Sequence, residues 1–451
     1  MQILQTRAGL PDPRHVHDIL DRHMLADGYP MVLDMQASQG GRLVDAVTGR
    51  SYVDLFTFYA SNPLGMNHPA LVGDGPGAAD FRERLMDAAI NKVANSDVYT
   101  PHMARFVETF SRVGIPEELP YAFFVAGGAL AVENALKTAF DWKVRHNRAA
   151  GRCAPDGHLG QQVLHFREAF HGRSGYTLSL TNTDPTKTDL FPKFDWPRIS
   201  TPKIHGGEGT VEAREAQAIA EAKAAFAAHG HDIAAIILEP IQAEGGDNHF
   251  RPEFFQALRD LADENEALLI FDEVQTGVGL TGSFWAWQGI GVTPDIIAFG
   301  KKTQVCGILA GRRLDDVDDH VFETSSRINS TWGGNLVDMV RFDRVLEVIE
   351  ADDLLAHVRA QGAHLMDRLD ALAARHDGVT SPRGRGLMCA FDLPDKATRD
   401  AVVNRTYDLG AVVLGCGTRS IRFRPSLCVT TEDLDAGLDL VEQAVDETLG
   451  R

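Results

Sequence analysis

Short apolar runs alternate with longer amphipathic stretches between about residues 80 and 300. The apolar runs have the length of buried strands, and the stretches between them repeat their apolar residues with the period of a helix. The runs that predict strands are Tyr121–Val125, Val163–Phe166, Ala234–Glu239, Ala267–Asp272 and Asp295–Phe299. The stretches that predict helices are Phe81–Asn95, Ala131–Arg145 and Pro252–Asn265. This pattern predicts an α/β fold with a mainly parallel sheet flanked by helices on both faces.

The two ends of the chain predict shorter elements. Before residue 60 these are one helix and three strands, Arg14–Leu25, Met31–Ala37, Arg42–Val47 and Ser51–Phe56. The last hundred residues predict a small α+β unit with the helices Met339–Ala351, Leu354–Arg375 and Thr431–Leu449 and the strands Leu387–Phe391, Val412–Leu414 and Ser420–Phe423. We therefore expect an N-terminal segment over residues 1–65, a large domain over 66–340 and a C-terminal small domain over 341–451.

Charge and composition disfavour some classes of partner. The 451 residues are 44% hydrophobic and 24% charged, which are the proportions of an ordinary globular protein. Acidic residues number 63 against 44 basic ones, which gives a formal net charge of −19. Such a surface disfavours binding to nucleic acid or to an anionic membrane, but it leaves room for a local basic pocket that binds a small anion.

Cysteine usage and the lack of a targeting signal predict a cytoplasmic protein. The five cysteines are scattered and have no CxxC spacing, which fits a reducing compartment and predicts neither a disulfide framework nor a metal site. The first seven residues lack the apolar core of a signal peptide. Val274–Pro294 carries no charge, but its Gly, Gln, Thr and Ser residues argue against a membrane helix.

A carboxylate, Asp272, ends the predicted strand Ala267–Asp272, at the edge where parallel sheets bind ligands. A buried Asp costs desolvation free energy unless it meets a cation, and a protonated pyridine nitrogen would be such a cation. An Asp at this place can equally cap the loop that follows its strand. From this segment alone both interpretations stay open.

Two consecutive lysines, Lys301 and Lys302, follow the next predicted strand. A lysine amine in a semi-enclosed site can lose its proton more readily and form a Schiff base with an aldehyde cofactor. Lysines beside strand ends are more often ordinary surface residues. Adjacent strand residues point to opposite faces, so only one of the two can face a cofactor. The pattern does not choose between them.

Two loops add candidate contacts for a flat ligand that bears a phosphate. Gly127-Gly128-Ala129 stands between a strand and a helix, where small residues let backbone N–H groups approach a phosphate. Phe170-His171-Gly172-Arg173 follows another strand, so its aromatic ring can stack on a flat ring and its Arg can bind a carboxylate. Gly-Gly turns and polar loops are common, and each segment is weak evidence by itself.

Together with further motifs, these segments resemble the class III aminotransferases, pyridoxal-phosphate enzymes of fold type I, over nearly the whole chain. The motifs are Gly127–Ala129, Phe170–Arg173, Glu239–Gly246, Asp272–Gly277, Asp295–Lys301, Ser330–Asn335 and Ile421–Leu427. Within the family the chain is most similar to members that act on L-lysine, through Arg173–Thr183, Phe191–Arg198, Lys301–Gly307 and Asn329–Asn335. The resemblance implies a large cofactor domain and a small domain that the N-terminal segment joins.

The resemblance also implies roles around the cofactor ring. Lys301, which directly follows Gly300, would be the Schiff-base lysine and the proton shuttle. Asp272 would keep the pyridine nitrogen protonated, so that the ring withdraws electrons. Gln275 would donate a hydrogen bond to the 3-oxygen of the ring and contact the substrate, and Phe170 would stack on the ring.

Phosphate contacts are implied from two directions. Gly128 and Ala129 would offer backbone N–H groups. Ser330 and Thr331 would reach the phosphate from a neighbouring subunit, which implies a homodimer. The turn reads Ala-Gly-Gly-Ala over residues 126–129, where relatives often carry a hydroxyl, so phosphate binding would depend on backbone donors.

Substrate contacts follow from the same resemblance. Arg173 would bind the carboxylate far from the reacting amine, and Arg422 would bind the α-carboxylate of 2-oxoglutarate. Glu244 would pair with Arg422 while lysine reacts and swing away for the dicarboxylate, since an unpaired guanidinium beside lysine's methylenes is costly. Asn329 would contact the lysine end. Ala243 stands where Gly is usual, which could stiffen Glu244.

The activity that the resemblance implies is a two-step aminotransfer. L-Lysine gives its 6-amino group to the cofactor and leaves as 2-aminoadipate 6-semialdehyde, and 2-oxoglutarate takes the amine and leaves as L-glutamate. Another donor, such as ornithine or 4-aminobutyrate, stays open as an alternative. An aminomutase, which needs no external keto acid, is a second alternative. A cofactor-binding regulator is a third, although no helix-turn-helix or basic patch supports it.

Overall fold

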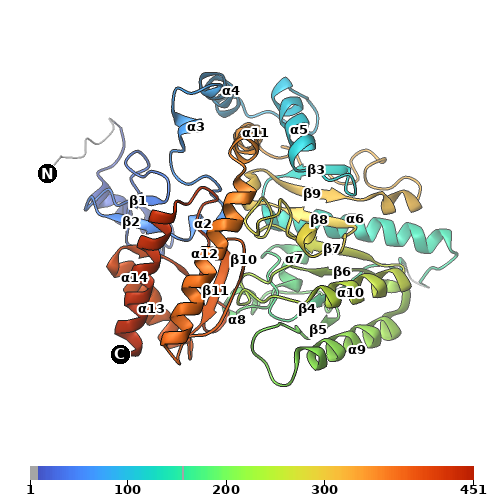
Figure 1. Ribbon diagram of the computed structural model, residues 1–451. Coiled ribbons are helices and arrows are strands. Elements are labelled where there is room, and N and C mark those ends of the chain that lie inside the picture. Colours follow the sequence, from blue (N-terminus) through green and yellow to red (C-terminus); the bar gives the residue numbers. More distant parts are fainter. Residues whose placement is uncertain (1–8, 155–156, 451) are drawn as a thin grey trace.

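A seven-stranded sheet forms the largest layer of the computed structural model, which describes residues 9–154 and 157–450 (Figure 1). Its strands, in the order β3-β9-β8-β7-β6-β4-β5, are Tyr121–Val125, Cys306–Ala310, Ile296–Phe299, Leu268–Asp272, Ile233–Leu238, Gln162–Phe166 and Arg198–Ile199. The five strands β8, β7, β6, β4 and β5 pair in parallel, and β9 runs antiparallel to both β8 and β3. The predicted mainly parallel sheet is therefore confirmed.

Helices cover both faces of this sheet. Helix α6 (Gly128–Ala149) packs on one face and α10 (Pro252–Glu264) on the other, and α9 (Val211–His229) packs beside α10. Along β7 the side chains alternate between these partners: Leu268 and Ile270 join the apolar cluster of α6, whereas Phe271 packs edge-on against Phe255 of α10. Because both faces are buried, every residue of β7 is apolar until Asp272.

Two smaller sheets lie beside the large one: a four-stranded antiparallel sheet and a three-stranded mixed sheet. The four-stranded sheet has the order β10-β11-β14-β13, with the strands Thr380–Arg385, Met388–Asp392, Ser420–Phe423 and Leu414–Cys416. In the three-stranded sheet, β1 (Arg42–Val44) and β2 (Ser51–Asp54) are joined by β12 (Ala411–Val412), which runs parallel to β2. The N-terminal segment thus shares a sheet with the C-terminal part of the chain.

Several helices complete the small unit and the upper edge of Figure 1. They are α4 (Ala78–Ile90), α5 (Pro101–Val113), α11 (Leu336–Ala351), α12 (Leu354–Arg375), α13 (Lys396–Leu409) and α14 (Thr431–Leu449). Short helical turns lie between them: η1 (Pro13–His15), α1 (Val16–Leu20), α2 (Thr57–Ala60), α3 (Pro69–Val72), α7 (Gly175–Leu180), α8 (Pro185–Thr188), η2 (Gly230–Asp232), η3 (Ala286–Gly289), η4 (Lys301–Thr303) and η5 (Arg312–Asp316).

The structure corrects four of the predicted elements, and one of them, the strand Val412–Leu414, is divided between β12 and β13 of different sheets. Met31–Ala37 is no strand, because Asp34 accepts hydrogen bonds from the N–H groups of the second and third residues after it and so forms a turn. The N-terminal helix ends at Leu20, since none of its residues is buried and no packing extends it. Helix α4 ends at Ile90, after which the chain runs on until Asn95 bonds to the backbone of residues 332 and 334. The prediction missed β9, β10, α5, α9 and α13.

No helix among the described residues is both long and apolar enough to cross a membrane. All five cysteines are free. The prediction that the chain begins without a signal peptide falls on residues 1–7, which lie outside the described part.

Phe110 lies at the centre of the aromatic core between α5, β8 and α11, and its removal is expected to destabilise the protein. Its ring centroid lies within 5.7 Å of those of Phe106, Phe299 and Phe342. Phe110→Ala leaves a cavity and should lower the free energy of unfolding by about 3–5 kcal/mol, measured by urea unfolding. Leu190→Ala, at a fully exposed side chain, should change it by less than about 0.5 kcal/mol. Equal effects of the two substitutions would contradict this packing.

Candidate active site

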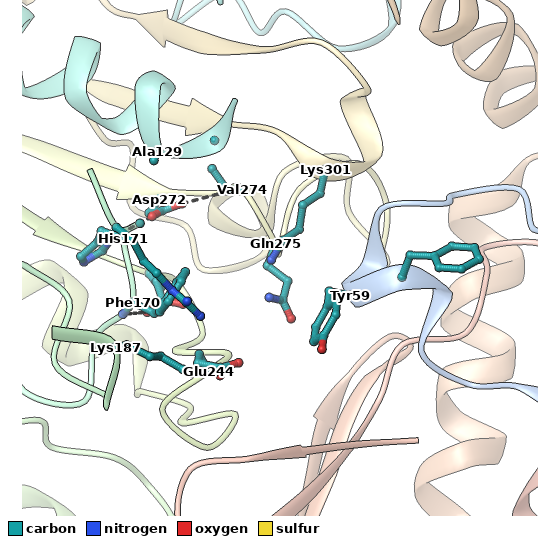
Figure 2. A pocket seen from close by; sticks show the side chains of 15 residues that line it. Tyr59, Ala129, Phe170, His171, Lys187, Glu244, Asp272, Val274, Gln275 and Lys301 are labelled. Atoms are coloured by element: carbon teal, nitrogen blue, oxygen red, sulfur yellow. Dashed lines mark hydrogen bonds and ion pairs between the residues drawn. The ribbon is translucent and has the colours of Figure 1, made fainter. Parts of the chain in front are cut away.

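A cavity of about 640 Å³ opens where the parallel strands end (Figure 2). It is lined by residues that follow β4, β6, β7 and β8, by the start of α6 and by the turn α2. Eight of the predicted site residues line it: Gly128, Ala129, Phe170, Arg173, Glu244, Asp272, Gln275 and Lys301. Segments far apart in the sequence therefore meet at the edge of the sheet where the prediction places a ligand site.

The structure separates the two tandem lysines. Lys301 follows β8 through Gly300 and points into the cavity toward Gln275 (Figure 2). Burial lowers the pKa of its amine to about 8, which leaves a nucleophilic amine at near-neutral pH. Lys302 points away, and its Nζ donates to the carbonyl oxygen of Gln275 at 2.6 Å. Lys301 is thus the lysine that can meet a ligand in the cavity.

Asp272 is part of a buried polar group below the cavity. Its Oδ2 lies 2.8 Å from Nδ1 of His171, and its Oδ1 accepts from the N–H of Val274 at 3.0 Å. Burial by itself would lower the pKa of His171, but the Asp272 carboxylate outweighs it and raises that pKa. Asp272 therefore reaches the cavity while hydrogen-bonded to an imidazole whose affinity for a proton it increases.

Glu239, at the end of β6, ties two site loops together. Its Oε1 accepts from the N–H of Phe170 and its Oε2 from the N–H of Ala243, both at 3.0 Å. Its complete burial raises the pKa to about 7. The ionised form holds the loop that carries Phe170 and the turn that carries Glu244 in one fixed arrangement.

The start of α6 offers backbone donors to an anion. The first N–H groups of a helix have no acceptor within the helix, and Gly128 and Ala129, the first two residues of α6, line the cavity. The loop of Gly172 packs so closely here that a Cβ on Gly172 would lie 2.6 Å from the Cβ of Ala129, and its φ of +126° also favours glycine. A helix start of this kind can bind a phosphate through its backbone N–H groups.

Gln275 is oriented by a residue from the small unit. Its Oε1 accepts from Nε of Arg424 at 2.9 Å, and Arg424 in turn forms a fully buried ion pair with Asp247 at 2.5 Å. Because the amide oxygen is occupied, the NH2 group of Gln275 is the part free to donate into the cavity. This fits the predicted acceptor, an oxygen on a ring.

Glu244 contacts two cations at the cavity. Its Oε2 accepts from Nη2 of Arg422 at 2.7 Å and its Oε1 from Nζ of Lys187 at 2.5 Å. Burial opposes ionisation, yet the two cations outweigh it and lower the pKa of Glu244 to about 2. The predicted pair of Glu244 and Arg422 is present, and Lys187 is an additional partner.

Phe170 lies between two cationic groups at the cavity wall. The guanidinium of Arg173 is 5.9 Å and the amine of Lys187 is 5.6 Å from its ring centroid. On another wall, Phe58 and Tyr59 reach the cavity from α2, where residues 57–60 all have positive φ. Non-glycine residues adopt this left-handed turn at a cost, which the packing around it must outweigh.

Three predicted residues lie away from this cavity. Asn329 and Thr331 are exposed and Ser330 is half-buried, and none of them lines the cavity of its own chain. The Asn329 side chain instead accepts from the N–H of Ser330 at 2.7 Å.

Five further residues shape the site without a role predicted from the sequence: Tyr59, His171, Lys187, Glu239 and Arg424. His171, Glu239 and Arg424 stand inside the quoted motifs: His171 is adjacent to Phe170 and Arg424 is two residues from Arg422, whereas Glu239 is five residues before Glu244. Lys187 and Tyr59 stand outside every motif. Only the fold brings them to the cavity.

The fold and the site define a class of protein. The family model of the class III aminotransferases matches residues 24–445, and the chain belongs to this family, as the motifs predict. The L-lysine-epsilon aminotransferase of Mycobacterium tuberculosis is 59% identical over 442 residues, which is 97% of each chain. A solved structure of a lysine aminotransferase from M. tuberculosis in the internal aldimine form matches with a TM-score of 0.94 and 58% identity, over 97% of this chain and 100% of that one. A probable mitochondrial 4-aminobutyrate aminotransferase of Caenorhabditis elegans is 35% identical, over 92% of this chain and 87% of its own length.

Protonation of Glu239 is expected to reduce aminotransfer on the acid side. The carboxyl gains a proton as the pH falls through about 7, and a protonated carboxyl no longer accepts both backbone N–H groups. We expect kcat/KM to fall with that protonation. Glu239→Gln has one acceptor oxygen at every pH, so its kcat/KM at pH 8 should be roughly tenfold lower. The variant should also lack the fall of kcat/KM that protonation of Glu239 causes. An unchanged acid limb in the variant would refute the assignment.

Proposed function

We propose that the protein transfers the 6-amino group of L-lysine to 2-oxoglutarate with pyridoxal phosphate as its cofactor. The products are 2-aminoadipate 6-semialdehyde and L-glutamate. The observation that carries the proposal is the cation Arg422, paired with Glu244 at 2.7 Å beside the cavity that holds Lys301. A cation that can be paired or released suits an enzyme whose first substrate has no carboxylate near the reacting amine and whose second one does.

The residues of the cavity fit the cofactor. Gly128 and Ala129 would bind its phosphate through N–H groups, Asp272 would pair with its ring nitrogen, and Gln275 would donate to its ring oxygen. Phe170 would stack on the ring. When bound, pyridoxal phosphate supplies an aldehyde that reacts with primary amines and a protonated ring that withdraws electrons.

Lys301 has two tasks in this proposal. Its amine, with a pKa of about 8, is the group that links to the cofactor. With the cofactor and lysine bound, Lys301 Nζ would take the proton that leaves the 6-carbon of lysine. The buried position of Lys301 keeps this amine away from bulk water.

Substrate binding uses the two arginines at different steps. Arg173 binds the α-carboxylate of lysine and, in the second step, the distal carboxylate of 2-oxoglutarate. Arg422 stays paired with Glu244 while lysine reacts, and it binds the α-carboxylate of 2-oxoglutarate afterwards. The higher identity to lysine aminotransferases than to the 4-aminobutyrate enzyme favours lysine as the donor.

The active unit in this proposal is a homodimer in the cytoplasm that binds no nucleic acid and no membrane. Ser330 and Thr331 contact the cofactor phosphate of the second copy, and Asn329 contacts its substrate. In support, none of the three lines the cavity of its own chain.

We also propose the domain limits 1–65, 66–340 and 341–451. The pairing of β12 with β2 supports the association of the first domain with the third.

The lysine that binds the cofactor can be identified by borohydride reduction. After reduction, mass spectrometry of the digested protein should find the cofactor on Lys301. Lys301→Ala should lose this label and about 10²–10⁴-fold in kcat, because its proton transfer is gone. Lys302→Met should keep the label on Lys301. A label on Lys302 would overturn the assignment.

The donor and the acceptor are tested by a substrate panel. Lysine with 2-oxoglutarate should yield glutamate and a cyclic imine, with a kcat/KM at least about tenfold above that of ornithine, which is one methylene shorter. The same margin is expected over 4-aminobutyrate. Ornithine outpacing lysine would refute the lysine assignment. Turnover without 2-oxoglutarate would instead indicate an aminomutase.

A further inference from the structure

The Glu244 carboxylate is held by two cations, and only one of them belongs to the expected pair. Arg422 contacts Oε2 at 2.7 Å and Lys187 contacts Oε1 at 2.5 Å. The Arg422 side chain is 1% exposed, whereas those of Lys187 and Glu244 are 20% and 26% exposed. Figure 2 shows Lys187 and Glu244 facing each other at the side of the cavity opposite Lys301. Glu244 therefore lies between a deeply buried cation and a cation nearer to water.

The backbone of Glu244 is fixed on both sides. The preceding N–H, of Ala243, donates to Glu239 at 3.0 Å, and the Glu244 carbonyl accepts from the N–H of Gly417 at 2.9 Å. The next residue is packed so tightly that a Cβ on Gly245 would lie 2.1 Å from the carbonyl oxygen of Glu168. Any movement of Glu244 away from Arg422 is therefore a rotation of its side chain.

The position of Lys187 is also fixed, through the short helix α8. Asp184 caps this helix by accepting from the N–H of Thr186 at 2.9 Å. The Lys187 amine lies over the ring of Phe170, at 5.6 Å from its centroid. The amine can thus stay beside Glu244 whether or not Arg422 is engaged.

In the proposed exchange of substrates, a dicarboxylate takes the place of Glu244 at Arg422. A half-buried carboxylate without a partner would then cost desolvation free energy, which would weaken binding of the dicarboxylate. Two further nitrogens of Arg422, Nε and Nη1, are buried and have no partner among the described residues. Arg422 is therefore ready to accept a second carboxylate, provided that Glu244 has another cation to hold it.

We propose that Lys187 is that cation: it keeps Glu244 neutralised after Glu244 has left Arg422, and so makes the site accept dicarboxylates. Lys187 is a specificity-determining residue that acts through Glu244. The inference rests on the proposed function for the exchange of substrates at Arg422. The charges then balance, because Arg173 and Arg422 face the two carboxylates while Lys187 and Glu244 compensate each other.

Binding of glutarate, a dicarboxylate that has no keto group to react, tests the proposal by isothermal titration calorimetry on the cofactor-loaded protein. Lys187→Met and Lys187→Gln should each raise the Kd of glutarate about tenfold, the loss expected for one charge-assisted contact. Lys187→Arg keeps the charge and should bind within about twofold of the unchanged protein. Thermal melts check that all variants fold.

A double-mutant cycle with Glu244→Gln separates the two possible roles of Lys187. A glutamine needs no counter-ion, so adding Lys187→Met to this variant should change the Kd by less than about threefold. A tenfold effect that persists in the Glu244→Gln background would overturn the proposal, since Lys187 would then bind glutarate directly. No effect of Lys187→Met in either background would overturn it as well. Glutarate binding does not depend on which amine donor the enzyme uses. This test of Lys187 therefore still holds if the protein fails to turn over lysine.

Discussion

Charged side chains that leave water at the carboxyl edge of the seven-stranded sheet must each meet a partner, and this constraint organises the site. Asp272 meets His171, and Glu244 meets Arg422 and Lys187. Each pair joins segments that are far apart in the sequence. An aminotransferase that binds different substrates in turn needs charged side chains that are paired in the free protein and can then bind a substrate. The ion pairs that stabilise the fold here are of this kind.

The small unit is necessary for that arrangement. Strand β14 brings Arg422 to Glu244, and Arg424, the residue directly after this strand, contacts Gln275 and Asp247. Both partners of the pair between Arg424 and Asp247 are fully buried, so removing either would leave a buried charge without compensation. The position of the C-terminal unit against the large sheet therefore fixes the substrate side of the cavity as well as the fold.

Sequence pattern predicted the parts of the structure whose signals are local. The apolar strands of the large sheet and the residues at their ends were predicted because burial on both faces leaves a continuous apolar run. Helix α9 was missed because it is rich in alanine and buries few large side chains, and α13 because it is mostly polar. Strand β9 is short and contains Gly307. The left-handed turn that delivers Tyr59, and the contact of Lys187 with Glu244, depend on tertiary packing that no local pattern encodes.

The central claim is that Glu244 releases Arg422 but keeps its contact with Lys187 when 2-oxoglutarate replaces lysine. A crystal structure of the cofactor-loaded protein with glutarate tests it most directly. The account predicts one glutarate carboxylate on Arg422, the other on Arg173, and the Glu244 carboxylate turned onto Lys187 alone. A structure in which Glu244 still pairs with Arg422, or in which a glutarate carboxylate lies on Lys187, would contradict it.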